Sequence, residues 1–196
     1  MSRNIFGGSA LVFALVACGG GEQETEVAVE DTTATAAAPA PAPAAGGSAA
    51  RATFINDQGT EIGTATLTPE GNGVRVEVDL AFLQAGEKGF HIHEVGSCTA
   101  PAFEDAGAHF NPTNAQHGNL EAGHAGDMEN LEVETDGGTA RGSWVNNKVT
   151  LTPGQPNSVL DADGSALVVH VNPDDHTTQP SGNSGTRIAC GIITAG

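Results

Sequence analysis

The run Val74-Arg75-Val76-Glu77-Val78-Asp79-Leu80 alternates strictly between apolar and charged residues. Successive side chains of a β-strand point to opposite faces, so this run predicts a strand with one buried face and one face in water. Leu131 and Val133 alternate with Glu132 and Glu134 in the same way. The chain also contains 27 Gly and 10 Pro, which weaken helix interiors. These patterns predict an antiparallel all-β fold and exclude a helical bundle.

Further strands are expected on both sides of these two, in short segments separated by Gly, Pro and Asn. They are Ala52–Asn56, Glu61–Leu67, Phe90–Val95, Ala140–Val145, Lys148–Leu151, Ala166–Val171 and Ile188–Ile193. Short strands of this kind are typical of an antiparallel sandwich or barrel. Two connections are unusually long, residues 96–130 and 171–187, and both are rich in metal-binding residue types. Long irregular loops in compact domains are usually either functional or disordered, and we expect these two to be functional because of their metal-binding residues.

The N-terminal residues 1–17 are predicted to be a lipoprotein signal peptide. They contain one early cation and then an apolar run, 10–17, which is shorter than the roughly 20 residues of a membrane-spanning helix. The ending Leu15-Val16-Ala17-Cys18 resembles a bacterial lipobox, in which Cys18 becomes the lipidated first residue. An ordinary secretory signal is the alternative. Both interpretations predict an exported protein, and the lipobox predicts a lipid anchor to the bacterial cell envelope, on the periplasmic or cell-surface side.

Residues 18–50 are expected to form a disordered Ala/Pro-rich tether, because their composition cannot bury enough apolar surface to order the chain. The folded domain is then 51–196, long enough for one well-buried core. The whole chain has a net charge of −17 with His neutral, and the folded block holds six basic and 19 acidic side chains. This balance excludes a general nucleic-acid binder. Besides Cys18, two cysteines remain, an even number in an oxidising compartment.

All seven histidines lie between residues 91 and 176, and they form two kinds of pattern. His91 and His93 are two apart, so on a strand their imidazoles project from one face. The loop residues His109, His117, His124 and Asp127 could surround a tetrahedral zinc ion, although a solvated loop with incidental histidines is the alternative. His170 ends an apolar strand, where a core or edge histidine is common. The set His91, His93, His109 and His170 would suit copper, which imidazole binds in both oxidation states.

Taken together, these pieces resemble one family, the copper/zinc superoxide dismutases. The matching motifs are Gly89-Phe90-His91-Ile92-His93-Glu94, Gly107-Ala108-His109-Phe110-Asn111-Pro112, His117-Gly118, His124-Ala125-Gly126-Asp127, Val168-Val169-His170 and Gly185-Thr186-Arg187-Ile188-Ala189-Cys190-Gly191. They occur in the family's order and span roughly 52–195. The resemblance implies a Greek-key β-sandwich or flattened barrel of about eight strands. It also implies dismutation of superoxide to dioxygen and hydrogen peroxide.

Residue by residue, the resemblance implies one copper and one zinc per chain. His91, His93, His109 and His170 would bind copper, and His109, His117, His124 and Asp127 would bind zinc, so His109 would bridge both metals. Asp174 matches the carboxylate that orients His91 and His117 from behind. Arg187 matches the arginine that guides the anion to copper. Cys98 and Cys190 match the family's disulfide.

One departure from the family concerns the approach of superoxide. Many relatives have lysines in the loop after the last copper ligand, but residues 172–185 contain neither Lys nor Arg. We therefore expect attraction of the anion to depend on Arg187, the copper and at most a distant Lys, with less efficient steering than in those relatives. His176 matches no ligand position and is expected to be a solvated loop histidine.

Three other functions are alternatives to superoxide dismutation. An envelope module that buffers copper or zinc without catalysis would not require Arg187, which binds no metal. A catalytically silent domain would have a broken ligand set, and a copper-only relative would have lost zinc positions, whereas both sets are intact. The expected partners are superoxide as substrate and a membrane through the lipid on Cys18, with no nucleic acid. Family members occur as monomers and as homodimers, and the sequence is compatible with either.

Overall fold

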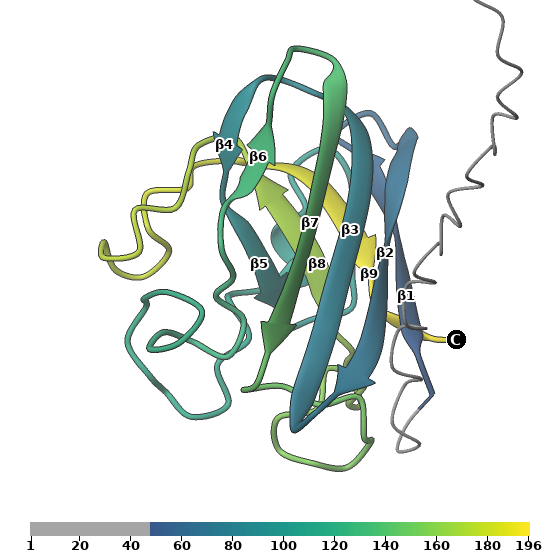
Figure 1. Cartoon of the computed structure of the whole chain (residues 1–196), viewed down its shortest axis with the longest axis vertical. Coiled ribbons are helices and arrows are strands. Elements are labelled where there is room, and N and C mark those ends of the chain that lie inside the picture. Colours follow the sequence, from purple (N-terminus) through teal and green to yellow (C-terminus); the bar gives the residue numbers. More distant parts are fainter. Residues whose placement is uncertain (1–47) are drawn as a thin grey trace, which may run out of the picture. The chain divides into compact units, whose positions relative to one another are not determined.

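A computed structural model of the chain describes residues 48–196, which form an all-β domain with one short 3₁₀ helix (Figure 1). The strands are β1 (Ala50–Asn56), β2 (Glu61–Glu70), β3 (Gly73–Leu83), β4 (Gly86–Lys88), β5 (Phe90–His93), β6 (Leu131–Val133), β7 (Gly138–Asn146), β8 (Ala166–His170), β9 (Arg187–Ile192) and β10 (Thr194–Ala195), and the helix is η1 (Glu104–Ala106). In this described part of the chain, no helix has the length and apolar character needed to cross a membrane.

The strands form one antiparallel sheet in the order β4-β6-β7-β3-β2-β1-β9-β8-β5, with β10 paired to β1. The two strands at the ends of this order, β4 and β5, are consecutive in the chain and are separated only by Gly89. The sheet therefore curls until its edges meet in one chain segment, which gives the flattened barrel of Figure 1. Connections that skip neighbouring strands, such as β3 to β4, give the sheet its Greek-key character.

The alternating run at 74–80 forms the central part of β3, as predicted. Val74, Val76, Val78 and Leu80 are buried, and the charged residues between them face outward. Their apolar face joins the main core, which includes Phe54 from β1 and Phe90 and Ile92 from β5. Burial of Phe90 and Ile92 fixes the register of β5, and that register determines where His91 and His93 lie.

The structure differs from the sequence prediction in strand number. Ten strands are present in the described residues where about eight were expected, because the short strands β4 and β10 have no sequence signal of their own. Conversely, residues 148–151 are not a strand. Asn147 and Lys148 lie in a turn, and Thr150 makes only an isolated bridge with Ser158. Val149 and Leu151 are still buried. The apolar residues at alternate positions in 148–151 therefore indicate burial of this segment, although it does not pair as a strand.

The expected signal peptide (1–17) and nearly all of the expected tether (18–50) lie outside the described residues. The folded domain begins slightly before residue 51. β1 starts at Ala50, whose partner in β10 is Ala195, and the carbonyl of Ala49 accepts a hydrogen bond from Gly196. The C-terminal residues thus pair with the first strand of the domain.

Candidate metal centre

Two neighbouring strands place three histidines together. β5 pairs with β8, and His170 is the last residue of β8. His91 and His93 alternate with the core residues Phe90 and Ile92, yet both imidazoles are buried, with His91 0% and His93 1% exposed. The face of β5 opposite the core is therefore covered, and the long loops cover it.

The loop between β5 and β6 runs back along β5 through backbone hydrogen bonds. The Ile92 carbonyl accepts from Phe110 at 2.9 Å, and the Ile92 amide donates to Gly126 at 2.8 Å. Isolated bridges consequently pair His93 with His109 and His91 with Asp127. Gly126 is needed for this close approach, since a Cβ there would lie 2.2 Å from the Ile92 oxygen. The local backbone thus brings loop ligands beside strand ligands.

The four residues predicted to bind copper form one buried group, with ligand atoms within 4.8 Å of one another: His91, His93, His109 and His170. His93 donates from Nδ1 to the Gly107 carbonyl at 2.9 Å, and His170 donates from Nδ1 to the Gly185 carbonyl at 3.0 Å. Each ring must then present an unprotonated Nε2, and these two nitrogens lie 3.4 Å apart. Two facing lone pairs repel each other unless a cation lies between or beside them.

The four residues predicted to bind zinc form a second buried group, whose ligand atoms also lie within 4.8 Å of one another: His109, His117, His124 and Asp127. Asp127 is central to it. Its carboxylate lies 2.8 Å from Nδ1 of His109, 3.1 Å from Nδ1 of His117 and 3.2 Å from Nδ1 of His124. Burial alone would raise the pKa of Asp127, but hydrogen bonds from His109 and the Gly118 amide outweigh it and lower this pKa to about 2. The group therefore has a fixed negative charge.

His109 belongs to both groups. Its Nδ1 faces Asp127, whereas its Nε2 is buried without a hydrogen-bond partner. The His91 and His109 ring centroids are 4.0 Å apart, so the free Nε2 is left for the group on β5 and β8. One imidazole can thus serve two metal positions.

The donor set fits two metal ions. Nδ1 of His91, Nε2 of His109 and Nδ1 of His117 and His124 are all buried and lack hydrogen-bond partners, which is costly unless another ligand satisfies them. Burial lowers the pKa of His91 and His93, and lowers that of His170 to about 4, so these rings are neutral and can donate lone pairs. Four imidazoles suit copper, and three imidazoles with one carboxylate suit zinc.

Asp174 connects the two groups from behind. Its Oδ2 lies 2.7 Å from Nε2 of His91, and its Oδ1 lies 2.9 Å from Nε2 of His117. Because carboxylates accept, both Nε2 atoms carry protons, and both Nδ1 atoms are left for metal. Its two oxygens thus fix the orientation of one histidine from each group, which is the role that the family resemblance implies for Asp174.

Two side-chain amides, which the sequence did not indicate, hold this arrangement in place. Asn130 accepts from the Asp174 amide at 2.8 Å and donates to the Asp174 carbonyl at 2.9 Å. Gln179 accepts from the His117 amide at 2.8 Å and donates to the His117 carbonyl at 3.0 Å. Each amide therefore fastens the backbone of a residue at the metal centre to the opposite long loop.

The expectation that His176 is a solvated loop histidine is wrong. Its φ of 56° and a 2.7 Å hydrogen bond from its amide to Oδ1 of Asp174 turn the ring inward. Nδ1 of His176 is buried and lies 3.6 Å from Oδ2 of Asp174, and the side chain is only 28% exposed. His176 is thus a half-buried neighbour of the carboxylate that joins the two groups.

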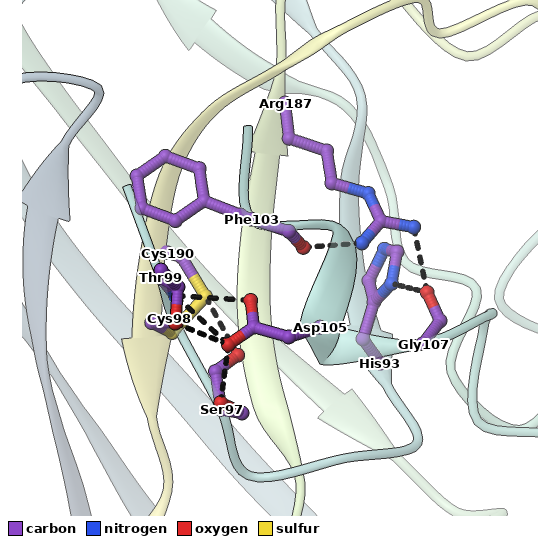
Figure 2. The surroundings of a disulfide bond; sticks show 9 residues. All are labelled: His93, Ser97, Cys98, Thr99, Phe103, Asp105, Gly107, Arg187 and Cys190. Carbon is purple, nitrogen blue, oxygen red and sulfur yellow. Dashed lines mark hydrogen bonds between the residues drawn. A yellow bond between two sulfur atoms is a disulfide. The ribbon is translucent and has the colours of Figure 1, made fainter. Parts of the chain in front are cut away.

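A surface pocket opens onto the copper-side group, and Arg187 lines it together with His93, His109 and His170. Figure 2 shows that the guanidinium donates to the carbonyls of Phe103 and Gly107, the second at 2.6 Å. The predicted disulfide between Cys98 and Cys190 is present, with a Cα–Cα distance of 5.7 Å. It ties the start of the loop to β9, three residues beyond Arg187. Cys18 lies outside the described residues.

Comparison with known proteins agrees with this geometry. The family model described as copper/zinc superoxide dismutase matches residues 61–193. The chain is 43% identical over 145 residues to superoxide dismutase [Cu-Zn] 1 of Aquifex aeolicus, covering 72% of this chain and 85% of the relative. Among solved structures, a superoxide dismutase-like protein of Bacillus subtilis matches with 38% identity and a TM-score of 0.69, covering 74% of this chain and 97% of that one. The Cu/Zn superoxide dismutase of Brucella abortus matches with 27% identity and a TM-score of 0.63, covering 74% and 99%.

Proposed function

Since the chain belongs to the copper/zinc superoxide dismutase family and catalyses superoxide dismutation, we propose that its two buried groups divide the metals as follows. Copper is held by His91, His93, His109 and His170, and zinc by His109, His117, His124 and Asp127. The observation that carries the proposal is the position of His109 in both groups, with its Nε2 free of any protein partner.

Bound copper supplies the one-electron chemistry, oxidising one superoxide to dioxygen and reducing a second, with two protons, to hydrogen peroxide. Arg187 binds the anion at the pocket wall by charge-assisted hydrogen bonds, and it is held there by two backbone carbonyls. The protein thus supplies a fixed cation beside three of the copper-side histidines.

His109 also handles a proton. Its Nδ1 faces the zinc side, so Nε2 is the atom that can accept a proton and return it to the product. Zinc, which has no redox chemistry, would hold the ring in place at Nδ1. Asp174 keeps His91 and His117 in the matching orientations throughout.

This assignment predicts that the purified protein binds one copper and one zinc per chain. Removing copper with a chelator should abolish the dismutase activity, and copper alone should restore it, with both metals quantified in the same samples. Activity that persists after complete copper removal would contradict the copper assignment. A protein that binds both metals but never dismutates superoxide would instead be a metal-buffering module.

We propose further that the mature chain is anchored by a lipid on Cys18 to the bacterial cell envelope. The support is the sequence Leu15-Val16-Ala17-Cys18 after a short apolar run, together with an Ala/Pro-rich tether. The disulfide between Cys98 and Cys190 agrees with an exported protein, because disulfides persist in oxidising compartments.

The anchor is tested by fractionation of bacteria that express the full-length chain. Wild type should sediment with membranes, with a lipid on Cys18 detectable by mass spectrometry. Cys18→Ser should release or mislocalise the protein without reducing the activity of the folded domain. Wild type found wholly in the soluble envelope fraction, with Cys18 unmodified, would show that the signal is an ordinary secretory one.

A further inference from the structure

The guanidinium of Arg187 is oriented by the loop that follows the disulfide. The two carbonyls that receive its hydrogen bonds, those of Phe103 and Gly107, flank the helix η1 on either side. The Gly107 carbonyl also receives Nδ1–H of His93. A shift of this short segment would therefore move the arginine, and would also disturb one copper-side histidine.

Phe103 is held in this position by packing. It is fully buried against Ala106, Val168 and Cys190 in a small core cluster of its own. Its φ of 55° lies in the left-handed region, which is uncommon for a residue with a side chain. The side chain thus anchors the segment while the backbone turns its carbonyl toward Arg187, as Figure 2 shows.

The middle of the segment is fastened by Asp105, the central residue of η1. Its carboxylate accepts hydrogen bonds from the hydroxyl of Ser97, from the Thr99 hydroxyl at 2.6 Å and from the Thr99 amide at 3.0 Å. These donors flank Cys98, so one side chain fastens η1 to the disulfide (Figure 2). The hydrogen bonds from Ser97 and Thr99 lower the pKa of Asp105 to about 2, which keeps the acceptor charged at neutral pH.

We propose that Asp105 is a positioning residue for the anion-binding site. By fastening η1 to residues 97–99, it fixes the two carbonyl oxygens that aim the guanidinium of Arg187. This inference rests on the proposed role of Arg187. Asp105 hydrogen-bonds Ser97 and Thr99 rather than Arg187 or a metal ligand, so it positions the guanidinium through the backbone of the 103–107 segment.

The adjacent residue Glu104 serves to distinguish the effect of the Asp105 charge from the effect of its hydrogen bonds. Burial lowers the pKa of Arg187, whereas the negative charges of Glu104 and Asp105 both act to raise this pKa. Both carboxylates therefore interact electrostatically with the guanidinium. Both side chains are exposed, but among the described residues the carboxylate of Glu104 accepts no hydrogen bond, whereas that of Asp105 does. Loss of either charge should favour an incoming anion. Only the loss of Asp105 should release the segment.

The test measures azide affinity by absorption titration of the copper- and zinc-loaded protein, with metal content and melting temperature determined for each variant. Asp105→Ala should raise the azide dissociation constant by about 10-fold, the lower end of effects seen for outer partners of metal sites. Glu104→Ala should leave it unchanged or lower it. The double variant Ser97→Ala/Thr99→Val keeps the charge of Asp105 but removes two of its donors, and should raise the constant by about 3-fold.

The proposal is overturned if Asp105→Ala binds azide as tightly as wild type, or more tightly in the manner of Glu104→Ala. Should Asp105→Ala fail to fold, the double variant decides, and unchanged azide affinity in it overturns the proposal. Arg187→Ala serves as the reference. If it too binds azide as wild type does, the proposed role of Arg187 is wrong; if it binds weakly while the Asp105 variants do not, only the positioning role is wrong.

Discussion

His109 links the two metal positions, and its neighbours explain how a single ring can do so. A buried imidazole normally has at least one nitrogen hydrogen-bonded to protein or water. Here Nδ1 faces the Asp127 carboxylate, and Nε2 has no partner at all. In His91, His93 and His170 the bonded nitrogen instead contacts a group outside both metal groups, which is Asp174 for His91 and a backbone carbonyl for the other two. The bonded nitrogen of His109 faces Asp127, which is itself a member of the zinc group. The hydrogen bonds therefore separate the bridging residue from the single-metal residues.

This separation predicts different metal losses for two alanine variants. His170→Ala removes a ligand that belongs only to the copper group, so copper should be lost and zinc largely retained, with activity at least ~100-fold lower. In His117→Ala zinc should be lost and copper largely retained, since His117 belongs only to the zinc group. Metal analysis of both purified variants checks this. Equal loss of both metals from each variant would show that the sites do not bind independently.

The eight predicted metal-site positions, with His109 counted in both sets, could be found from the sequence because each belongs to a motif of distinctive residue types. Asn130 and Gln179 could not, because a side-chain amide bound to a distant backbone depends on how two loops meet. His176 was misjudged for the same reason. Its inward turn follows from a left-handed φ and a hydrogen bond to Asp174, neither of which residue type reveals.

At the scale of elements, the metal centre lies where β5 and β8 meet the two long loops. The strands supply fixed positions, because their registers are set by buried Phe90 and Ile92. The loops are fastened to each other through Asn130 and Gln179, and the loop before β9 reaches the zinc side through Asp174 and Gln179. Alternation in the sequence predicted the strands; it could not predict β4, which is three residues long and recognisable only by its pairing with β6.

Loss of the Gln179 clamp should loosen zinc. Gln179→Ala removes both hydrogen bonds to the backbone of His117, and we expect zinc to dissociate about 10-fold faster while copper is retained. Asn183→Ala is the matched control, because Asn183 bonds only Asp175 and Thr178 within its own loop. Zinc release is followed with a chromophoric chelator. Identical release rates in the two variants would mean that Asp174 alone is sufficient to hold His117.

Reduction of the disulfide should destabilise the domain as a whole. Cys98 and Cys190 are 92 residues apart, and the chain-entropy model assigns about 4–5 kcal/mol to closing a loop of that length. Cys98→Ser/Cys190→Ser should therefore lower the free energy of unfolding by several kcal/mol in denaturant titrations of the metal-free protein. A loss below about 1 kcal/mol would show that the unfolded chain without the disulfide retains structure that already restricts it.

For the molecule as a whole, charge governs the encounter with an anionic substrate. Of the six cations in the folded block, Arg75 and Arg141 form ion pairs with Glu70 and Asp79. Lys88 is buried, and Lys148 donates to the carbonyl of Gly123. Arg51 lies on β1, which β9 separates from β8 and β5 in the sheet order. Of these cations only Arg187 lines the pocket, where Glu94 is also present.

This distribution predicts a shallow dependence of the dismutation rate on ionic strength. Salt screens attraction and repulsion alike, with a Debye length of about 10 Å at 0.1 M, and a well-steered enzyme slows as salt is added. Here the acidic background opposes the one local cation, so the two effects largely cancel in wild type. Arg187→Glu replaces this cation by a negative charge, so that repulsion outweighs attraction, and its low residual rate should rise with salt, with copper content unchanged.

Adding one cation at the pocket should create the steering that this chain lacks. Ser181 lines the pocket, and its hydroxyl donates no hydrogen bond in the described structure, so Ser181→Lys adds charge without removing a side-chain hydrogen bond. We expect a higher rate at low salt and a steeper decline as salt is added. Thr64→Lys is the control, because it adds the same charge on the exposed face of β2, which three strands separate from β5 in the sheet. Pulse radiolysis over a range of ionic strength measures the dismutation rate of wild type, Arg187→Glu, Ser181→Lys and Thr64→Lys. A wild-type rate that already falls steeply with salt would mean that a positive potential reaches the pocket from elsewhere, and Ser181→Lys would then add little.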